Sequence, residues 1–333
     1  MPSRECSASG CDDAVRVGSV QLLRYDDLRA AGLSAAAIAR SVRVRGLVRV
    51  RPGVFADGAA WQTARPESRV IARARALELI SHTRPVFSHE TAAALHGLPL
   101  FRPSPDRVHV ITAEDRPGAA SGVIRHRGVI ADADVIEIDG LSCTTLLRTV
   151  SDVARTAAFE QSVTITDAAL RSLCVPKPGT YLSDRAQAWR DEALEIARES
   201  AHGLSRARRA LGFADGRAQL PGESVSRVRL SELGFQDPDL QVTVSGPHGS
   251  KYYVDFGFHD QRAFGEFDGT MKYVDGRLTD GRTSSEVFDR EKQREDWIRG
   301  RTQYRFSRWG WPHIETATIL GARLLAFGIR PPH

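Results

Sequence analysis

The C-terminal third of the chain carries the pattern that most restricts its fold. Three strand-like segments are separated by short turns, at residues 240–245, 251–258 and 263–268. Helices are expected at residues 223–233, 284–299 and 315–327, and a fourth strand at residues 303–309. Gly234 and Gly300 are expected to end the first and second of these helices. Helix, three strands, helix, strand and helix in succession predict one α/β domain, which we assign to residues 216–333.

Acidic residues recur on two of these strands. A four-residue loop joins the strands at 251–258 and 263–268 and pairs Phe258 with Ala263. In that register Asp255 lies opposite Glu266, and Asp268 shares the face of Glu266 because strand side chains repeat every two residues. The alternate positions are apolar and are expected to face the core: Val254, Phe256, Phe258 and Phe267.

Three carboxylates that converge on one side of a hairpin predict a cation site. Like charges this close repel one another unless a proton or a cation lies between them. An oxygen-rich set suits Mg²⁺ or Mn²⁺, which activates a water molecule and stabilises charge on a phosphate. Glu223, at the start of the preceding helix, is expected to add a fourth oxygen ligand. A solvated hairpin face is the alternative, although opposed acids destabilise a hairpin.

The N-terminal region, residues 15–60, predicts a winged helix-turn-helix. Three helices are expected, at residues 20–23, 25–31 and 35–42. Gly32 ends the second helix and Ser34 caps the third. Residues 46–55 alternate with period two around a Pro52-Gly53 turn, which predicts a hairpin that serves as the wing.

A cluster of arginines in this region predicts binding to a polyanion. Five of them fall within twelve residues that contain no acid: Arg40, Arg43, Arg45, Arg49 and Arg51. On a recognition helix and wing, guanidinium groups bind phosphates and read guanine edges. The net charge of +5 agrees with a polyanionic partner. We therefore expect double-stranded DNA as the partner, with protein docking as the alternative.

The pattern of residues 61–205 predicts a middle α/β domain, to which we assign no catalytic role. Helices are expected at 67–81, from the N-cap Ser88 onward, and at 146–154 and 160–173; strands are expected at 107–111 and 122–126. His89 and His96 lie two helical turns, roughly 10 Å, apart, which is too far for a chelate, so both are interpreted as packing residues. Asp152 and Asp167 lie near arginines and are expected to form structural ion pairs.

The composition, the cysteine spacing and the lengths of the apolar runs exclude several classes of protein. Hydrophobic residues make up 41% and charged residues 26% of the chain, which is typical of a globular protein. The four cysteines form no Cys-x-x-Cys pair, so a zinc ribbon or a disulfide framework is not expected. No run of about 18 apolar residues and no signal peptide is present. We expect a cytoplasmic, multidomain α+β protein with no membrane contact and a disordered tail at residues 1–14.

The N-terminal half resembles the AbiEi-type antitoxins of type IV toxin–antitoxin systems. The resemblance rests on residues 25–55 and on Ser88-His89-Glu90-Thr91-Ala92-Ala93-Ala94-Leu95-His96-Gly97. Residues 147–155 and 167–171 are similar to the second domain of related proteins, so that the match covers roughly residues 15–175. The resemblance implies a winged helix that binds promoter DNA and represses its own gene, with a cognate toxin as a partner.

The C-terminal third resembles very-short-patch-repair-type members of the PD-(D/E)XK nuclease superfamily. The motifs are Gly222-Glu223-Ser224-Val225-Ser226-Arg227, Val254-Asp255-Phe256, Gly265-Glu266-Phe267-Asp268-Gly269, Lys272-Tyr273, Asp289-Arg290-Glu291-Lys292-Gln293-Arg294 and Tyr304-Arg305-Phe306-Ser307-Arg308-Trp309. The resemblance implies a restriction-endonuclease-like fold in which Asp255 and Glu266 bind the metal and Glu223 is an accessory acid.

One position departs from that family. Asp268 stands where the family often has a lysine that positions the attacking water. Lys272 is a candidate to supply the missing ammonium group, and a solvated lysine is the alternative. Arg290 and Arg294 lie one turn apart on a polar helix and are expected to contact phosphate; pairing of Arg290 with Glu286 is the alternative.

Two functions follow. The first is a metal-dependent DNA endonuclease, targeted by its winged helix, that acts in defence or repair. The second is an AbiEi-family antitoxin and transcriptional autorepressor whose nuclease fold is inactive. Intact Asp255, Glu266 and Glu223 favour the first, whereas Asp268 and the antitoxin-like half favour the second. A nucleotidyltransferase toxin is disfavoured, because no Gly-Ser motif is followed by paired aspartates in a strand.

Overall fold

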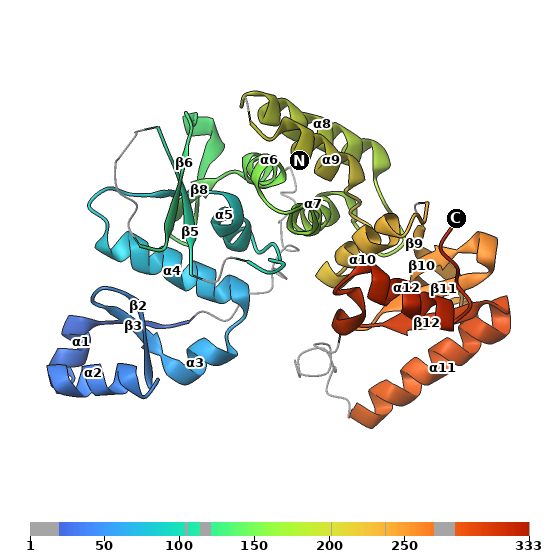
Figure 1. Ribbon diagram of the computed structural model, residues 1–333, viewed down its shortest axis with the longest axis horizontal. Helices are drawn as coiled ribbons and strands as arrows, with labels where there is room; N and C mark the ends of the chain where they lie inside the picture. Colours follow the sequence, from blue (N-terminus) through green and yellow to red (C-terminus); the bar gives the residue numbers. More distant parts are fainter. Residues whose placement is uncertain are drawn as a thin grey trace, which may run out of the picture. The chain divides into compact units, whose positions relative to one another are not determined.

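The protein has a mixed α+β architecture with three β-sheets in its described part (Figure 1). The computed structural model describes residues 20–103, 106–113, 121–200, 202–236, 238–269 and 284–332, and within the last range the side chains from residue 289 onward. The expected tail at residues 1–14 lies outside these ranges. The chain divides into two units, residues 1–153 and 154–333. None of the helices in the described ranges is long and apolar enough to cross a membrane.

The first unit begins with a three-stranded sheet in the order β1-β3-β2. Its strands are β1 (Leu22–Arg24), β2 (Leu47–Arg51) and β3 (Val54–Asp57), and its helices are α1 (Tyr25–Ala30), α2 (Ala35–Arg43) and α3 (Gly58–Thr63). The Ser34 hydroxyl accepts the Ala37 N–H at 3.1 Å, which confirms the expected cap of α2. The helix expected at residues 20–23 is wrong. Leu22 and Leu23 instead pair with β3, where strand pairing outweighs the local helical pattern.

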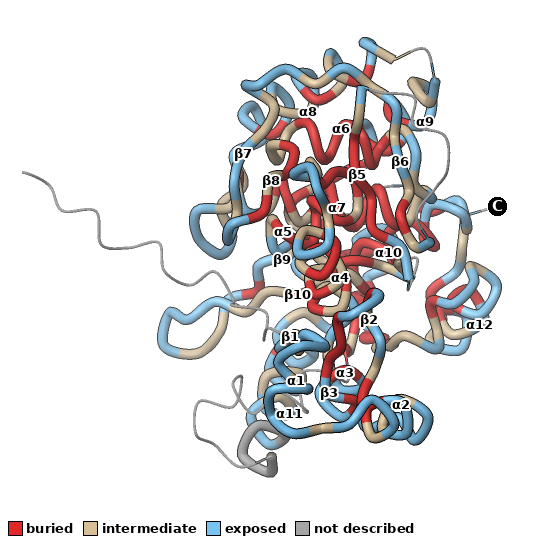
Figure 2. The backbone as a smooth tube through the Cα atoms, turned by 90° about the vertical axis from the view of Figure 1, so that its left-hand side faces the viewer, coloured by how far each residue is buried: buried red, intermediate tan, exposed pale blue. Residues whose placement is uncertain are grey.

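A five-stranded sheet in the order β6-β5-β4-β8-β7 forms the rest of this unit. The strands are β4 (Val86–Phe87), β5 (Val108–Thr112), β6 (Val123–Arg127), β7 (Val135–Ile138) and β8 (Leu141–Thr144). Helices α4 (Pro66–Ile80) and α5 (His89–Leu95) pack against it, and α6 (Leu146–Thr156) follows it. Phe87, Val108 and Cys143 are fully buried in the core, which Figure 2 shows as red segments of β5 and β8. The expected helices at 67–81 and 146–154 and the two expected strands are confirmed.

The second unit opens with helices. They are α7 (Phe159–Cys174), α8 (Ser183–Arg198), α9 (Leu204–Phe213) and α10 (Pro221–Glu232). The sequence predicts α7 and α10 but not α8. Gly234, with φ +82°, lies just after α10 as expected.

A four-stranded sheet in the order β12-β11-β10-β9 completes this unit. Its elements are β9 (Asp239–Ser245), β10 (Lys251–Phe258), β11 (Ala263–Phe267), α11 (Ser284–Thr302), β12 (Arg305–Trp309) and α12 (Ala317–Ala326). Phe258 pairs with Ala263, which confirms the predicted hairpin register. The four apolar residues expected in the core are buried. The expected end of α11 at Gly300 is wrong, since the helix continues to Thr302 and the left-handed residue is Gln303, with φ +57°.

The two faces of this sheet are covered by different helices. Ile298 of α11 packs with Phe264 and Phe306 on one face. On the other face the Trp309 indole donates to the Ser226 hydroxyl of α10 at 2.8 Å. Of the predicted carboxylates, Asp255 lies on β10, Glu266 on β11 and Glu223 at the start of α10, whereas Asp268 follows the end of β11.

Candidate carboxylate site

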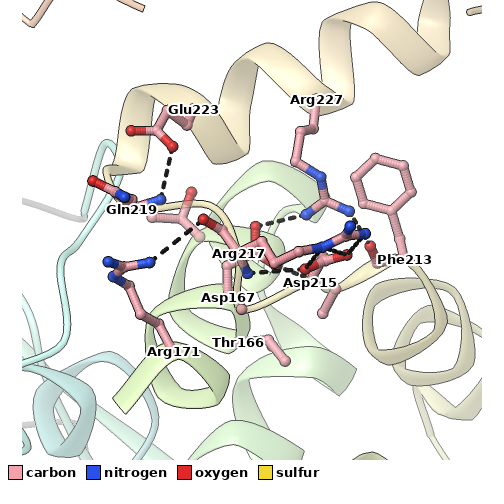
Figure 3. A network of polar contacts seen from close by, with 12 residues as sticks. Thr166, Asp167, Arg171, Phe213, Asp215, Arg217, Gln219, Glu223 and Arg227 are labelled. Carbon is pink, nitrogen blue, oxygen red and sulfur yellow. Dashed lines mark hydrogen bonds and ion pairs between the residues drawn. The ribbon is translucent and has the colours of Figure 1, made fainter. Parts of the chain in front are cut away.

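Glu223 is held at the first turn of α10. Pro221 begins the helix, where its missing N–H is not needed. Glu223 is 3% exposed, and its carboxylate accepts the Gln219 N–H at 2.8 Å (Figure 3). A Cβ atom on Gly222 would collide with the Phe267 ring of β11, so only glycine allows this approach of α10 to the sheet. Glu223 is thereby fixed close to β11.

A polar network supports the segment before Glu223. Asp167 of α7 pairs with Arg227 of α10 at 2.8 Å and accepts the Asp215 N–H at 2.7 Å (Figure 3). Asp215 in turn binds Arg217 at 2.7 Å. The expected ion pair of Asp167 is therefore present, although its partner is Arg227 rather than the nearby Arg171. Asp152 pairs with Arg148 at 3.1 Å, as expected.

Asp255 and Glu223 share one amide group. The Gln241 Nε2 atom lies 3.2 Å from Asp255 Oδ1 and 3.4 Å from Glu223 Oε2. The other oxygen of Asp255 accepts the Phe267 N–H at 2.9 Å. Two acids from α10 and β10 therefore lie beside a single side chain of β9.

Gln241 is the residue of this group that sequence reasoning missed. It lies between Leu240 and Val242, where the alternation of β9 makes it look like an ordinary outward-facing residue. Its φ of +53° is in the left-handed region, which a non-glycine residue enters at a cost and which recurs at functional sites. No sequence signal marks that conformation.

Glu266 is the most buried acid of the hairpin, at 8% exposed. Burial raises the pKa of its carboxyl group to about 7, against the opposing effect of the hydrogen bond from Arg294, and the charge of Asp255 raises it further. Glu266 pairs with Arg294 at 2.5 Å and with Arg308 at 3.2 Å. The two guanidinium groups also pair with Glu291, so Glu266 belongs to a larger network of charges.

The remaining expected ligands are arranged differently. Asp268 is half-buried, and its N–H donates to the Trp309 carbonyl at 2.7 Å. Lys272 lies outside the described residues. Among the residues that are described, no three of these acids lie close enough together to form a ready set of metal ligands, and Glu266 pairs with Arg294 instead. The acids themselves still fit Mg²⁺ or Mn²⁺, since all of them offer carboxylate oxygens, whereas Gln241 presents its amide nitrogen to Asp255 and Glu223.

The expected DNA-binding arginines fall into two groups. Four side chains are exposed on α2 and β2 or the turn between them: Arg40, Arg43, Arg45 and Arg49. Arg51 is 8% exposed, and its guanidinium donates to the Ser121 and Gly122 carbonyls. This arginine therefore joins the first hairpin to the turn before β6 instead of facing solvent.

The two arginines expected on α11 also differ. Arg290 is exposed. Arg294 binds Glu266, the Tyr253 carbonyl at 2.5 Å and Glu291 at 2.8 Å, so its charge is directed into the carboxylate site.

Comparison with known proteins gives distant relatives without an assigned function. Two uncharacterized proteins of Mycobacterium tuberculosis, from strains CDC 1551/Oshkosh and H37Rv, are each 29% identical to this chain over 227 residues. The aligned part is 68% of this chain and 75% of each relative. No family model matches the chain.

Proposed function

We propose that this chain is a DNA-binding protein whose C-terminal unit hydrolyses phosphodiester bonds with the aid of Mg²⁺ or Mn²⁺. The observation that carries the proposal is the group formed by Glu223, Gln241 and Asp255, with Glu266 as an electrostatic neighbour. Burying several acids side by side costs free energy that packing alone does not return. A perturbed carboxyl pKa at such a place is typical of a functional site.

Each residue has a distinct role in this proposal. Asp255 and Glu266 would hold the ion, and Glu223 would orient a water molecule or add an oxygen ligand. A bound ion supplies Lewis acidity to the phosphate and lowers the pKa of a coordinated water. Arg294 and Arg308 pair with Glu266 and also with Glu291, and beside a bound ion they would be the cations available to contact a phosphate.

DNA binding is proposed for the first unit. We take α1, α2 and the β2–β3 hairpin as a winged helix-turn-helix. The four exposed arginines supply the phosphate contacts, and these make the affinity depend on salt. Arg51 is excluded from this surface by its burial.

Cleavage of supercoiled plasmid in Mg²⁺ or Mn²⁺ tests the nuclease. Asp255→Asn and Glu266→Gln keep the side-chain shapes and remove the charges, so both are expected to abolish nicking. Asp260→Asn changes an exposed acid in the loop of the same hairpin and is expected to leave nicking intact. If both site variants still nick the plasmid, the assignment of Asp255 and Glu266 as metal ligands is wrong.

A second candidate function is an AbiEi-family antitoxin or transcriptional autorepressor with an inactive nuclease fold. The ion pairs of Glu266 favour it, because they neutralise that acid without a metal. Asp268 at the usual lysine position favours it as well. On this alternative, the pure protein protects its own promoter in a footprinting assay, copurifies with a cognate toxin and leaves every plasmid uncut.

A further inference from the structure

Three histidines meet in the first unit, far along the chain from one another. His89 is the first residue of α5, His109 lies on β5 and His126 on β6. In the parallel pairing of β5 with β6, His109 is level with Ile124, two residues before His126. Both side chains therefore project from one face of the sheet, because strand side chains repeat every two residues. Helix α5 packs against β5 and brings His89 to that face.

The three rings are in direct contact. The His109 Nδ1 atom lies 2.9 Å from His126 Nε2. The rings of His89 and His126 stack with their centroids 3.4 Å apart. One nitrogen from each histidine can be chosen so that all three lie within 4.8 Å of one another. Ligand nitrogens about 2.0–2.1 Å from a tetrahedral ion are roughly 3.3 Å apart, so modest rotation of the rings would close the set.

The three histidines are largely buried, which distinguishes them from histidines that gather on an exposed surface. His89 is 2% exposed and His109 is 9% exposed, whereas His126 is half-buried on edge strand β6. The site is thus enclosed on the side of α5 and reachable from solvent at His126. His89 also has a φ of +51°, an uncommon conformation for a non-glycine residue at the start of a helix.

Oxygen atoms of two neighbouring side chains lie near the histidine rings. The Glu90 carboxylate lies 3.9 Å from His109 Nε2, on the ring edge away from His126. Ser88 is the N-cap residue of α5, as the sequence predicts, but its hydroxyl makes no capping bond and lies 3.0 Å from His89 Nδ1. Ser88 is thus placed as an outer partner that orients an imidazole ligand and selects the nitrogen that binds, whereas Glu90 lies beyond hydrogen-bond distance.

We propose that His89, His109 and His126 form a binding site for one divalent transition-metal ion, of which Zn²⁺ is the representative. Three imidazole nitrogens select zinc and its neighbours in the first transition row, whereas Mg²⁺ prefers oxygen. The ion would join α5 to edge strand β6. This site shares no residue with the carboxylates of the second unit and does not depend on the nuclease proposal.

Metal binding to the full-length protein tests this inference. The protein is stripped with chelator, dialysed and titrated with Zn²⁺ in a calorimeter, and Co²⁺ is added separately to give the visible absorption bands of a tetrahedral site. We expect one strongly bound ion per chain. His126→Gln is the main variant, because His126 is partly exposed and its replacement leaves the core intact. It should weaken Zn²⁺ binding about 100-fold or more, since loss of an outer partner alone costs about 10–100-fold.

Matched controls make the result decisive. His82→Gln replaces an exposed histidine of the same unit and is expected to bind Zn²⁺ as the wild type does. Asp255→Asn is also expected to bind normally, which separates this site from the proposed nuclease site. Circular dichroism confirms that each variant is folded. Equal Zn²⁺ affinity in wild type and folded His126→Gln, or no tetrahedral Co²⁺ spectrum from the wild type, would overturn the proposal.

Discussion

At the scale of single residues, Gly222 sets how closely α10 approaches β11. Gly222→Ala would force a methyl group into the Phe267 ring, and overpacking of this kind costs about 1–3 kcal/mol. We expect that loss in the free energy of unfolding, measured with urea. Gly212→Ala is the control, because nothing lies within 4 Å of its Cβ position in helix α9. It should be neutral or stabilising by up to about 1 kcal/mol. Equal stability of the two variants would contradict the close approach.

The ionisation of Asp215 is expected to make the stability of the folded protein depend on pH in a defined direction. Burial disfavours its charged form, but hydrogen bonds from Arg217 outweigh that effect and lower the pKa of Asp215 below the usual 3.8. A carboxylate with a lowered pKa in the folded state stabilises the protein above the unfolded pKa, and this contribution is lost as pH falls through the folded value. Asp215→Asn should therefore be less stable than wild type at pH of about 7, and the difference should shrink below pH of about 4.

Urea unfolding of both proteins at a series of pH values measures that difference. Asp296→Asn alters an exposed acid of α11 and should show a difference from wild type that is small at every pH. A gap between Asp215→Asn and wild type that widens as pH falls would show that the Arg217 contact does not stabilise the charged carboxylate.

At the scale of elements, strand β2 carries two arginines with opposite expected effects. Arg49→Ala should leave stability within about 0.5 kcal/mol and make the dependence of DNA affinity on salt less steep by about 0.9 in the log–log slope. Arg51→Ala removes the donors to the Ser121 and Gly122 carbonyls, so it should cost about 1–3 kcal/mol of stability without changing the slope. Fluorescence anisotropy with duplex DNA at several salt concentrations provides the slopes. A slope that changes for Arg51→Ala and not for Arg49→Ala would reject the proposed DNA surface.

Elements with strong local signals were predictable from the sequence. Ser34 fixes the start of α2, and the four-residue loop fixes the register of β10 with β11, because both depend on residues close together in the chain. The local pattern of residues 20–23 predicts a helix, because it cannot show that Leu22 and Leu23 pair with Ala56 and Phe55 of β3. Helix α8 was missed altogether.

The carboxylate site and the group of three histidines also show which contacts the sequence can predict and which it cannot. The acids of β10 and β11 were found because one hairpin carries them, but the ion pairs of Glu266 come from α11 and β12 and have no local signature. The sequence relates His89 to His96, two turns along a helix, whereas the structure places His89 beside His109 and His126. His96 instead lies 2.8 Å from the Thr144 carbonyl. Contacts between elements that are separated in the sequence, helices as well as strands, decide both cases.

At the scale of the whole molecule, the chain consists of two units with separate cores. Each unit contains one proposed metal site, and the ligands differ in kind: imidazole nitrogens in the first unit and carboxylate oxygens in the second. Proteins built from more than one unit often unfold in more than one step, so a single midpoint need not describe this chain.

Differential scanning calorimetry of the full chain can separate the two units. We expect two transitions, because each core can melt without the other. Zn²⁺ at about 100 times its dissociation constant adds about 2.7 kcal/mol to the unit it binds, which should raise one midpoint by roughly 5–10 °C. Chelator should reverse that shift, and His126→Gln should abolish it. Gly222→Ala should lower the other midpoint and leave the Zn²⁺-sensitive one unchanged. If instead both changes move a single transition, the units unfold together as one cooperative body, and their division reflects contact density alone.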